Sequence, residues 1–515
     1  MSSIKVINFA LIFLLIGISR VAPYKILVIF PTGSYSHQRP QQAVSEGLAE
    51  AGHHVTILTP NLLKTSNPNI TQVDINFTYG FIKEFDLSAT IGPYEMLGLM
   101  SKIFAKVHDG LMEYEPFASV VKNIKKEKYD AVIVEALPYF PFFVAKEIFD
   151  TTLIGLSTLE LMPMFHKAMG NLIHPTLHPS FFIDSPTNPS IWDRISMVHY
   201  ALYELYWEKF DLFPRLDAII KKYFPETKSK SKDLIRSLDL VLEGITPVLG
   251  NVRPVVPNTI RIGFLHIKEP KVLPNPLKSY LDNSKTGVIY LSFGSNVKSA
   301  QLKPHIRKTI MDTFRRLKYD ILWKYENDTV EGKPNNVRIE KWLPQMDLLA
   351  HKNIKVFITQ GGGQSMEETI ARGVPVVVIP FFADQDANAQ KMENLGIGRR
   401  LNVNELTVEK LESTIMEVIN NPKYKQTVKQ LGDRIRDTPM TPVQTAVWWI
   451  EYAIRNRGAE HLKYKGTDVP FIEYYLIDVI AVHLVGIFLV LYVLKKLFNM
   501  IRGGNSKTTK KMKKQ

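Results

Sequence analysis

The fold is decided by residues 342–385, whose sequence is WLPQMDLLAHKNIKVFITQGGGQSMEETIARGVPVVVIPFFADQ. The apolar run Val356–Thr359 predicts a strand, which three glycines then break. A helix is expected to open at Ser365 with a capping-box pattern and to close near Gly373. The continuous apolar run Val376–Ile379 predicts a strand buried on both faces. Strand, glycine turn, helix and strand form half of a nucleotide-binding sheet, and the helix start is an anion site suited to a diphosphate.

The three glycines alone are a weak signal, because Gly361–Gly363 is neither a Rossmann fingerprint nor a P-loop. The whole stretch is more specific. It resembles the signature of the UDP-glycosyltransferases, and Phe357–Gly362 (FITQGG) is most similar to the insect microsomal members. The resemblance covers most of residues 25–494. It implies an α/β fold of the GT-B type, with two facing Rossmann-like domains, an interdomain cleft and a C-terminal transmembrane helix.

The net charge of +14 at first suggests a nucleic-acid partner. However, eight of the Lys and Arg residues lie in residues 495–515, which contain no acid, so the basic excess is largely a tail. We find no RNA- or DNA-binding motif and expect no nucleic-acid partner. The chain has no cysteine, which excludes disulfides, cysteine catalysis and thiolate metal sites.

The N-terminus has the pattern of a secretory signal. Residues 7–18 are almost wholly apolar and follow Lys5, so we interpret residues 1–22 as a signal peptide cleaved near Ala22. A first core strand or a retained anchor is the alternative.

A second apolar run predicts a membrane span at residues 474–494, followed by a basic tail at 495–515. The positive-inside rule places that tail in the cytosol and the preceding chain in the lumen, which is a single-pass type I topology. Lys511 and Lys513 fit a di-lysine retrieval pattern for the endoplasmic reticulum, and a polybasic membrane-surface anchor is the alternative. The N-glycosylation sequons at Asn69, Asn76 and Asn327 agree with a lumenal chain.

The rest of the chain is divided by its strand patterns. Strands are expected at 25–31, 54–58, 128–135 and 152–157, with a helix at 41–51 and a loop at 33–37 between the first two strands. The expected parts are an acceptor-binding α/β domain (23–265), a Pro-rich linker (266–283), a UDP-sugar-binding α/β domain (284–445) and C-terminal helices (446–473) that resemble those packing back on the first domain in the family.

Aromatic side chains crowd residues 192–210. Bulky apolar loops at the mouth of a sheet suit a lipophilic acceptor pocket. The spacing of Tyr203, Trp207 and Phe210 is equally that of a helix burying its core face, and we favour packing for most of these aromatics.

The resemblance implies a donor site in the second domain. Trp342 and Gln345 would form the uracil shelf, Glu368 would bind the ribose, and Asp384 with Gln385 would hold the sugar hydroxyls. The residues at phosphate-contacting positions are Gly294, Ser295, Gln360, Gly362, Gln364 and Ser365.

Two of these residues have a second reading. Gln360 stands where many relatives have a phosphate-binding His, which leaves more of the phosphate to backbone amides and Ser295. Glu368 is either the ribose ligand, which we favour, or the partner of Ser365 in the capping box.

Asp384 and Asp386 form an Asp-x-Asp, but we expect no metal, because amides and a helix dipole can stabilise a leaving diphosphate.

The first domain is expected to supply a general base. His37 follows the first strand, and Glu135 ends a neighbouring strand, so parallel strand ends bring them to one edge. A histidine can take a proton from an acceptor hydroxyl, and a carboxylate orients its ring. The family usually has Asp at the position of Glu135.

We therefore expect an inverting UDP-glycosyltransferase that moves a hexose to a hydroxyl of a small lipophilic acceptor, a detoxifying conjugation, with no cofactor beyond the UDP-sugar co-substrate. The insect-type pattern favours UDP-glucose over UDP-glucuronate. A non-catalytic lumenal binding protein and an enzyme acting on a lipid-linked glycan are the alternatives. A homo-oligomer is left open by the sequence.

Overall fold

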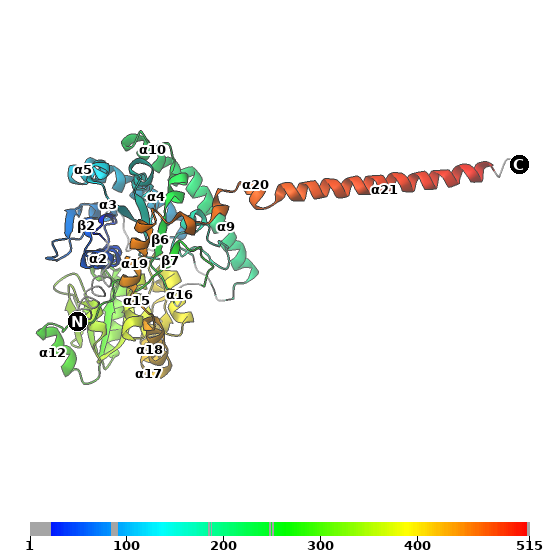
Figure 1. Ribbon diagram of the computed structural model, residues 1–515. Coiled ribbons are helices and arrows are strands. Elements are labelled where there is room, and N and C mark those ends of the chain that lie inside the picture. Colours follow the sequence, from blue (N-terminus) through cyan, green and yellow to red (C-terminus); the bar gives the residue numbers. More distant parts are fainter. Residues whose placement is uncertain are drawn as a thin grey trace, which may run out of the picture. The chain divides into compact units, whose positions relative to one another are not determined.

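Two parallel β-sheets carry the larger part of the chain (Figure 1). The computed structural model describes residues 22–83, 91–183, 186, 188–246, 249 and 252–511. The chain divides into two units, Met1–Lys463 and Tyr464–Gln515. Except for Ala22, the expected signal peptide lies outside the described residues.

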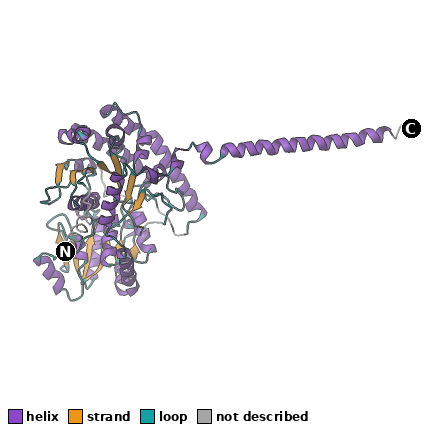
Figure 2. Ribbon diagram, viewed as in Figure 1, coloured by secondary structure: helices purple, strands orange, loops and turns teal. Residues whose placement is uncertain are grey.

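The first sheet has seven strands in the order β3-β2-β1-β4-β5-β6-β7. Its central strands are apolar runs that are buried on both faces, as helices on either side of a parallel sheet require (Figure 2). The strands are β1 Lys25–Ile29, β2 His54–Thr59, β3 Ile70–Asp74, β4 Ala131–Glu135, β5 Thr152–Leu156, β6 Leu240–Glu243 and β7 Thr259–Arg261.

The second sheet has six strands in the order β10-β9-β8-β11-β12-β13. Every described pairing in both sheets is parallel. The strands are β8 Val288–Ser292, β9 Asp320–Lys324, β10 Val337–Glu340, β11 Ile354–Thr359, β12 Val376–Val378 and β13 Gly398–Arg400. The short strands β3, β6, β7, β10 and β13 were not among our predictions, because their apolar runs are brief and lie within polar sequence.

Helices connect these strands. Those of the first sheet are α2 Tyr35–Glu50, α3 Thr78–Lys83, α4 Pro93–Glu113, α5 Glu115–Lys122, α6 Ile124–Glu127, α7 Ala145–Phe149, α8 Pro163–Met169, α9 Ile191–Trp207, α10 Phe213–Tyr223 and α11 Ser231–Leu234. Those that follow are α12 Asn275–Asn283, α13 Pro304–Arg316, α14 Gln345–Leu349, α15 Gly363–Arg372, α16 Gln385–Asn394, α17 Val408–Asn420, α18 Pro422–Arg436 and α19 Pro442–Arg455. Helix α19 packs on α2, β5 and β6 and buries Ala446, Ile450 and Ala453 in the core of the first sheet.

In both sheets the strand order reverses at one place. The reversal falls between β1 and β4 in the first sheet and between β8 and β11 in the second. The loops that leave neighbouring strands there run to opposite sides and open a crevice at the carboxyl ends. His37 follows β1 and Glu135 ends β4, while Gly294 follows β8 and Gln360 follows β11. The fold therefore gathers the predicted site residues at its two crevices.

Two predicted helix starts are wrong. Helix α2 begins at Tyr35 rather than Gln41, so His37 lies in its first turn and not in a loop. Pro40 suggested a later start, but it sits inside the helix, early enough to be tolerated. Helix α15 begins at Gly363 with Gly362 as its N-cap residue and has no side-chain cap, so the capping box expected at Ser365 is absent.

Two further features were not expected from the sequence. The predicted linker contains helix α12, which buries Leu277 and Leu281 at the spacing of one helical turn. In the aromatic segment, Tyr200 and Trp207 are buried as expected, but Trp192 is 76% exposed and Tyr206 and Phe210 are also exposed. The helix covers the core with one face only, and spacing alone did not reveal which face that is.

The second unit contains α20 Phe471–Tyr474 and α21 Ile477–Lys511. Residues Ile477–Ile501 of α21 form the one helix in the described parts of the chain that is long and apolar enough to cross a membrane. This segment starts and ends later than the predicted span of 474–494.

Gly432 tests the packing of α18 on α15. A Cβ added at Gly432 would lie 2.5 Å from the carbonyl oxygen of Ile370 in α15. We expect Gly432→Ala to destabilise the fold by about 1–3 kcal/mol through overpacking. The matched control is Gly98→Ala in α4, where an added Cβ meets no atom within 4 Å, and we expect a gain of up to about 1 kcal/mol there. Thermal unfolding of the two variants measures both effects, and an equal response would contradict the packing described.

Candidate active site

His37 and Glu135 form a close pair at the edge of the first sheet. The Nδ1 atom of His37 lies 2.7 Å from Oε1 of Glu135 and 3.2 Å from Oγ1 of Thr158. Glu135 is 1% exposed, whereas the His37 side chain is 17% exposed and lines a cavity. With Nδ1 facing the carboxylate, Nε2 is the ring nitrogen available to a ligand.

The second oxygen of Glu135 is also engaged. Oε2 accepts a hydrogen bond from Oγ1 of Thr32 at 2.7 Å, and the Thr32 hydroxyl lies 2.9 Å from the Tyr139 hydroxyl. Burial, and then the charge of Glu135, raise the pKa of Tyr139, so this phenol stays neutral. Both carboxylate oxygens of Glu135 are therefore held in place. The Glu side chain, which is longer than the Asp usual in the family, contacts His37 from this fixed position.

Two cavities meet beside this pair. A cavity of about 370 Å³ is lined by residues of both sheets, among them Trp342, Gln345 and Glu368. A cavity of about 220 Å³ is lined by His37 together with Gln360, Asp384 and Gln385. Both are lined by Ser36, Gly294, Ser295, Gln364 and Ser365. The shared lining makes them neighbouring parts of one cleft, the larger one suited to a nucleotide.

Trp342 stands at the mouth of the larger cavity. Its side chain is 56% exposed, and the Tyr35 ring from the first sheet's side meets it edge to face at 5.1 Å between centroids. The Lys324 ammonium lies 5.9 Å from the Trp342 ring. An indole that is more than half exposed at the mouth of a cavity can stack on a planar base.

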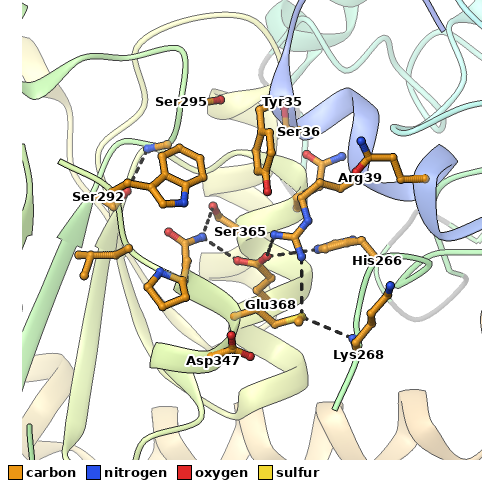
Figure 3. Close-up of a pocket in the computed structure, with 18 of the residues that line it drawn as sticks. Tyr35, Ser36, Arg39, His266, Lys268, Ser292, Ser295, Asp347, Ser365 and Glu368 are labelled. Atoms are coloured by element: carbon orange, nitrogen blue, oxygen red, sulfur yellow. Dashed lines mark hydrogen bonds and ion pairs between the residues drawn. The ribbon is translucent and has the colours of Figure 1, made fainter. Parts of the chain in front are cut away.

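Glu368 is the most connected residue of the larger cavity (Figure 3). Its Oε1 accepts a hydrogen bond from the Arg39 guanidinium at 3.1 Å, and its Oε2 accepts one from Nε2 of Gln345 at 2.7 Å. Nε2 of His266 lies 3.5 Å from Oε1. Burial acts to raise the pKa of Glu368, but His266, Arg39 and Gln345 outweigh it, and the pKa is lowered. The carboxylate is therefore kept ionised and can accept hydroxyl hydrogen bonds.

These contacts exclude one of the two readings of Glu368, the capping box, and leave ribose binding as a prediction. Its carboxylate turns toward Arg39 and Gln345, and Ser365 Oγ instead accepts from Nε2 of Gln345 at 3.0 Å. The capping reading is wrong. Arg39 belongs to α2, on the side of the first sheet, and was missed because a helix starting at Gln41 would leave it in a loop. Because α2 starts at Tyr35, Arg39 lies one helical turn after Tyr35 and on the same face of the helix.

In the smaller cavity a glycine allows close packing. Gly294 has φ +75°, and a Cβ there would lie 2.4 Å from Nε2 of Gln360. Gln360 Oε1 accepts from the Thr359 hydroxyl at 3.0 Å. In the first turn of α15, Gln364 Nε2 donates to the carbonyl oxygen of Thr158 at 3.1 Å. This hydrogen bond connects the helix of the second sheet to the loop that follows β5 of the first sheet.

Asp384 and Gln385 begin α16 beside these residues. Asp384 Oδ2 accepts from Asn388 at 2.7 Å, and burial raises the pKa of Asp384 despite that hydrogen bond. Gln385 Oε1 accepts from the backbone N–H groups of Phe381 and Phe382. Ala383, just before them, has φ +56°, a strained value for a residue with a Cβ. The backbone there holds both side chains at the cavity.

The Asp-x-Asp pattern does not converge on one point. Asp386 Oδ1 pairs with Arg400 at 2.8 Å, while Asp384 bonds Asn388. Within the described ranges, no group of three or more His, Asp or Glu side chains is arranged to hold a metal ion.

The wall around His37 is apolar. It is built by Met96 and Met100 of α4 and by Leu137, Leu159, Phe181 and Phe182. A ligand that approaches Nε2 of His37 from this side meets hydrocarbon and aromatic surface, which suits a lipophilic body.

Glu367, next to Glu368, faces the segment that connects the two sheets. Its Oε1 accepts from the Phe264 N–H at 2.9 Å, and Nδ1 of His266 lies 3.4 Å from its Oε2. Phe264 has φ +62°. Burial raises the pKa of Glu367 to about 8, so this carboxyl is protonated at neutral pH.

Comparison with known proteins places this site in context. A family model described as "UDP-glucoronosyl and UDP-glucosyl transferase" matches residues 25–515. The chain is 31% identical to "UDP-glycosyltransferase UGT5" of Dactylopius coccus, over 96% of this chain and 97% of that one. It is 30% identical to "Ecdysteroid UDP-glucosyltransferase" of Spodoptera littoralis nuclear polyhedrosis virus, over 91% of this chain and 95% of that one.

Solved structures share the fold. The glycotransferase of kitacinnamycin superimposes with a TM-score of 0.59 at 19% identity and covers 84% of this chain and 98% of that one. Glycosyltransferase VinC in complex with DTDP gives 0.56 at 16% identity and covers 84% of this chain and 100% of that one. The expected GT-B fold, with two Rossmann-like sheets, is confirmed.

The raised pKa of Glu367 makes stability depend on pH. The unfolded chain releases this proton near pH ~4.3, whereas the folded chain keeps it up to about pH 8, so stability falls as pH rises between those values. Glutamine can accept the Phe264 hydrogen bond and cannot ionise. We expect the gain in unfolding temperature from Glu367→Gln to be larger at pH 8 than at pH 5. The exposed control Glu331→Gln should show no such trend, and a pH-independent gain would contradict a protonated Glu367.

Proposed function

The chain belongs to the UDP-glucoronosyl and UDP-glucosyl transferase family, and from this premise we propose that it transfers glucose from UDP-glucose to a hydroxyl of a small lipophilic acceptor. The reaction would invert the anomeric carbon and give a β-glycoside. The observation that carries the proposal is the His37–Glu135 pair, 2.7 Å apart and facing a cavity contiguous with the nucleotide-sized one.

In the proposed step, Nε2 of His37 takes the proton of the acceptor hydroxyl as its oxygen attacks the anomeric carbon. The new C–O bond forms on the face opposite the diphosphate, and the bond from that carbon to the UDP oxygen breaks. Glu135 stabilises the imidazolium that forms and keeps the ring oriented, and Thr32 holds Glu135 in place. Single displacement of an α-linked donor yields the β-product.

The donor would lie along the second sheet's crevice. Trp342 stacks on the uracil, with Gln345 beside it, and Glu368 accepts from the ribose hydroxyls. The phosphates are met by Ser295, Gln360, Gln364, Ser365 and the backbone at Gly294 and Gly362, where the N-terminus of α15 adds its dipole. Asp384 and Gln385 take the hexose hydroxyls.

UDP-glucose is favoured over UDP-glucuronate by charge. The two residues proposed to hold the hexose are Asp384 and Gln385, and neither provides a cation for a glucuronate carboxylate. The relative from Spodoptera littoralis nuclear polyhedrosis virus is named a UDP-glucosyltransferase, which agrees with this choice. UDP-glucuronate is the alternative donor, and no metal or further cofactor is proposed.

We also propose a location. With a signal peptide at 1–22 and α21 as anchor, both sheets would face the lumen of the endoplasmic reticulum and the basic tail the cytosol. Conjugation of lipophilic compounds there would serve detoxification. Asn76 and Asn327 are exposed, so glycans are proposed at these two sequons, whereas Asn69 donates its amide to the Ala49 carbonyl. The domain division proposed from the sequence is kept, with α12 inside its linker.

The test uses microsomes that carry the full chain, several UDP-sugars and a panel of phenols. We expect transfer from UDP-glucose, and a loss of about 10²-fold or more for His37→Ala, because general-base catalysis contributes about that much. His305→Ala, an exposed histidine of α13, is the matched control and should keep the wild-type rate.

The affinity of His37→Ala for UDP is measured alongside. Unchanged affinity would show that a lower transfer rate is not caused by lost donor binding. Unchanged transfer by His37→Ala would refute the base. Binding of UDP-sugars with no transfer by the wild type would support a non-catalytic binder. Transfer to lipid-linked glycans but not to phenols would show that the acceptor is a lipid-linked glycan and not a small lipophilic compound.

A further inference from the structure

A separate cavity of about 160 Å³ lies in the first sheet's half of the chain, outside the proposed reaction site. It is lined by α8, the segment 173–180 and α9, which continues at Glu208 into a π-helical turn, and it opens to solvent beside Ile173 and Leu205. It shares no lining residue with the cavity that holds His37. One wall comes from the aromatic segment 192–210, for which the sequence left an acceptor pocket or packing open, and the reaction proposed at His37 assigns this cavity no role.

The walls of this cavity are mostly apolar. They are formed by Pro163, Ile173, Pro175, Met197, Ala201 and Leu205. A cavity of this volume holds an apolar body about the size of benzene. Shape and lining therefore suit a small lipophilic molecule rather than water alone.

Three polar atoms at the cavity have no partner. Oε1 of Glu204, Nδ1 of His178 and Oγ of Ser180 have no partner at hydrogen-bond distance and angle among the described residues, although the Ser180 hydroxyl lies close enough to Glu204 to act on its pKa and lower it. These residues are 5%, 8% and 6% exposed, so water does not replace the missing partners at the surface. A buried polar atom left without a hydrogen bond costs about 1–3 kcal/mol, so a ligand group that bonds to such an atom would recover that free energy.

The cavity is lined by more acidic side chains than fixed cations. Glu204 and Glu208 both line it, and the one fixed cation in its lining is Lys167, at the exposed rim. Burial raises the pKa of Glu204 to about 8 and that of Glu208 to about 7, and Lys167 partly offsets the shift of Glu208. His178 adds no charge, because burial, and then Arg253, lower its pKa. At neutral pH Glu204 is therefore held largely protonated in the empty cavity, and its ionised form would need a counter-charge that the described lining does not supply.

We propose that this cavity binds a small primary amine, with the ammonium group at Glu204 and the apolar body against Met197, Ala201 and Leu205. The ammonium supplies the counter-charge for Glu204 and hydrogen-bond donors for the unpartnered oxygens of Glu204 and Ser180. It also has an N–H for Nδ1 of His178. An alcohol would fill the same space but leave the acid without a cation, and a carboxylate would add a like charge.

The test measures binding of three probes of equal length, hexylamine, hexan-1-ol and hexanoate, to the full chain in detergent by isothermal titration calorimetry. We expect the amine to bind most tightly. Glu204→Gln keeps the shape but removes the charge, and should weaken the amine by about tenfold or more while leaving the alcohol unchanged. Ala201→Trp should fill the cavity and abolish binding of amine and alcohol alike.

Glu113→Gln, an exposed carboxyl on α4, is the matched control and should bind the amine like the wild type. Unfolding temperatures of all variants verify that they are folded. Equal affinity for amine and alcohol, tighter binding of hexanoate, or no effect of Glu204→Gln in a folded variant would each overturn the proposal. Amine binding that survives Ala201→Trp would place the ligand elsewhere and overturn it as well.

Discussion

The reversal of strand order in each parallel sheet is the constraint on which the site depends. Parallel strands send their connections out at one edge, and a crevice opens only where neighbouring connections leave to opposite sides. In this chain the reversals fall at β1/β4 and β8/β11. The first places His37 beside Glu135, and the second places Gly294 against Gln360 at the N-terminus of α15. The proposed proton acceptor and the proposed diphosphate site follow from topology before any side chain is chosen.

The two crevices become one site through a few contacts between the sheets. Arg39 reaches Glu368, Gln364 donates to the Thr158 carbonyl, and Asn296 donates to the Ser34 hydroxyl. Each of these contacts joins a residue near His37 to the helix or loop proposed to hold the donor. A nucleotide bound at Glu368 therefore touches the network that positions the base. Donor binding would therefore order the residues of both crevices before the acceptor reacts. Holding the reacting groups in the right geometry is one way in which binding accelerates a reaction.

Much of this arrangement was readable in the sequence. Apolar runs predicted the strands that lead to His37 and end at Glu135, and the strand, turn, helix and strand within residues 356–379. The site roles of Trp342, Gln345, Glu368, Asp384 and Gln385 came from the family resemblance and stay predictions. The start of α2 was misjudged because Pro40 normally marks the first turn, and Arg39 was missed with it. Ser365 and Glu368 fit a capping box locally, but Gly362 caps the helix, and both side chains bond Gln345, a partner that no local pattern reveals. Exposure of Trp192 was equally hidden, because periodicity does not show which face is covered.

The central claim is that His37 removes the proton of the acceptor, and acceptors that differ in acidity test it directly. Thiophenol is largely ionised near neutral pH and needs no base, whereas phenol does. The measurement is the rate of glucosyl transfer to each acceptor by the wild type and by His37→Ala at saturating UDP-glucose. The account predicts that His37→Ala loses transfer to phenol and keeps most of its transfer to thiophenol. Equal loss with both acceptors would mean that His37 serves another purpose, such as holding the cleft together.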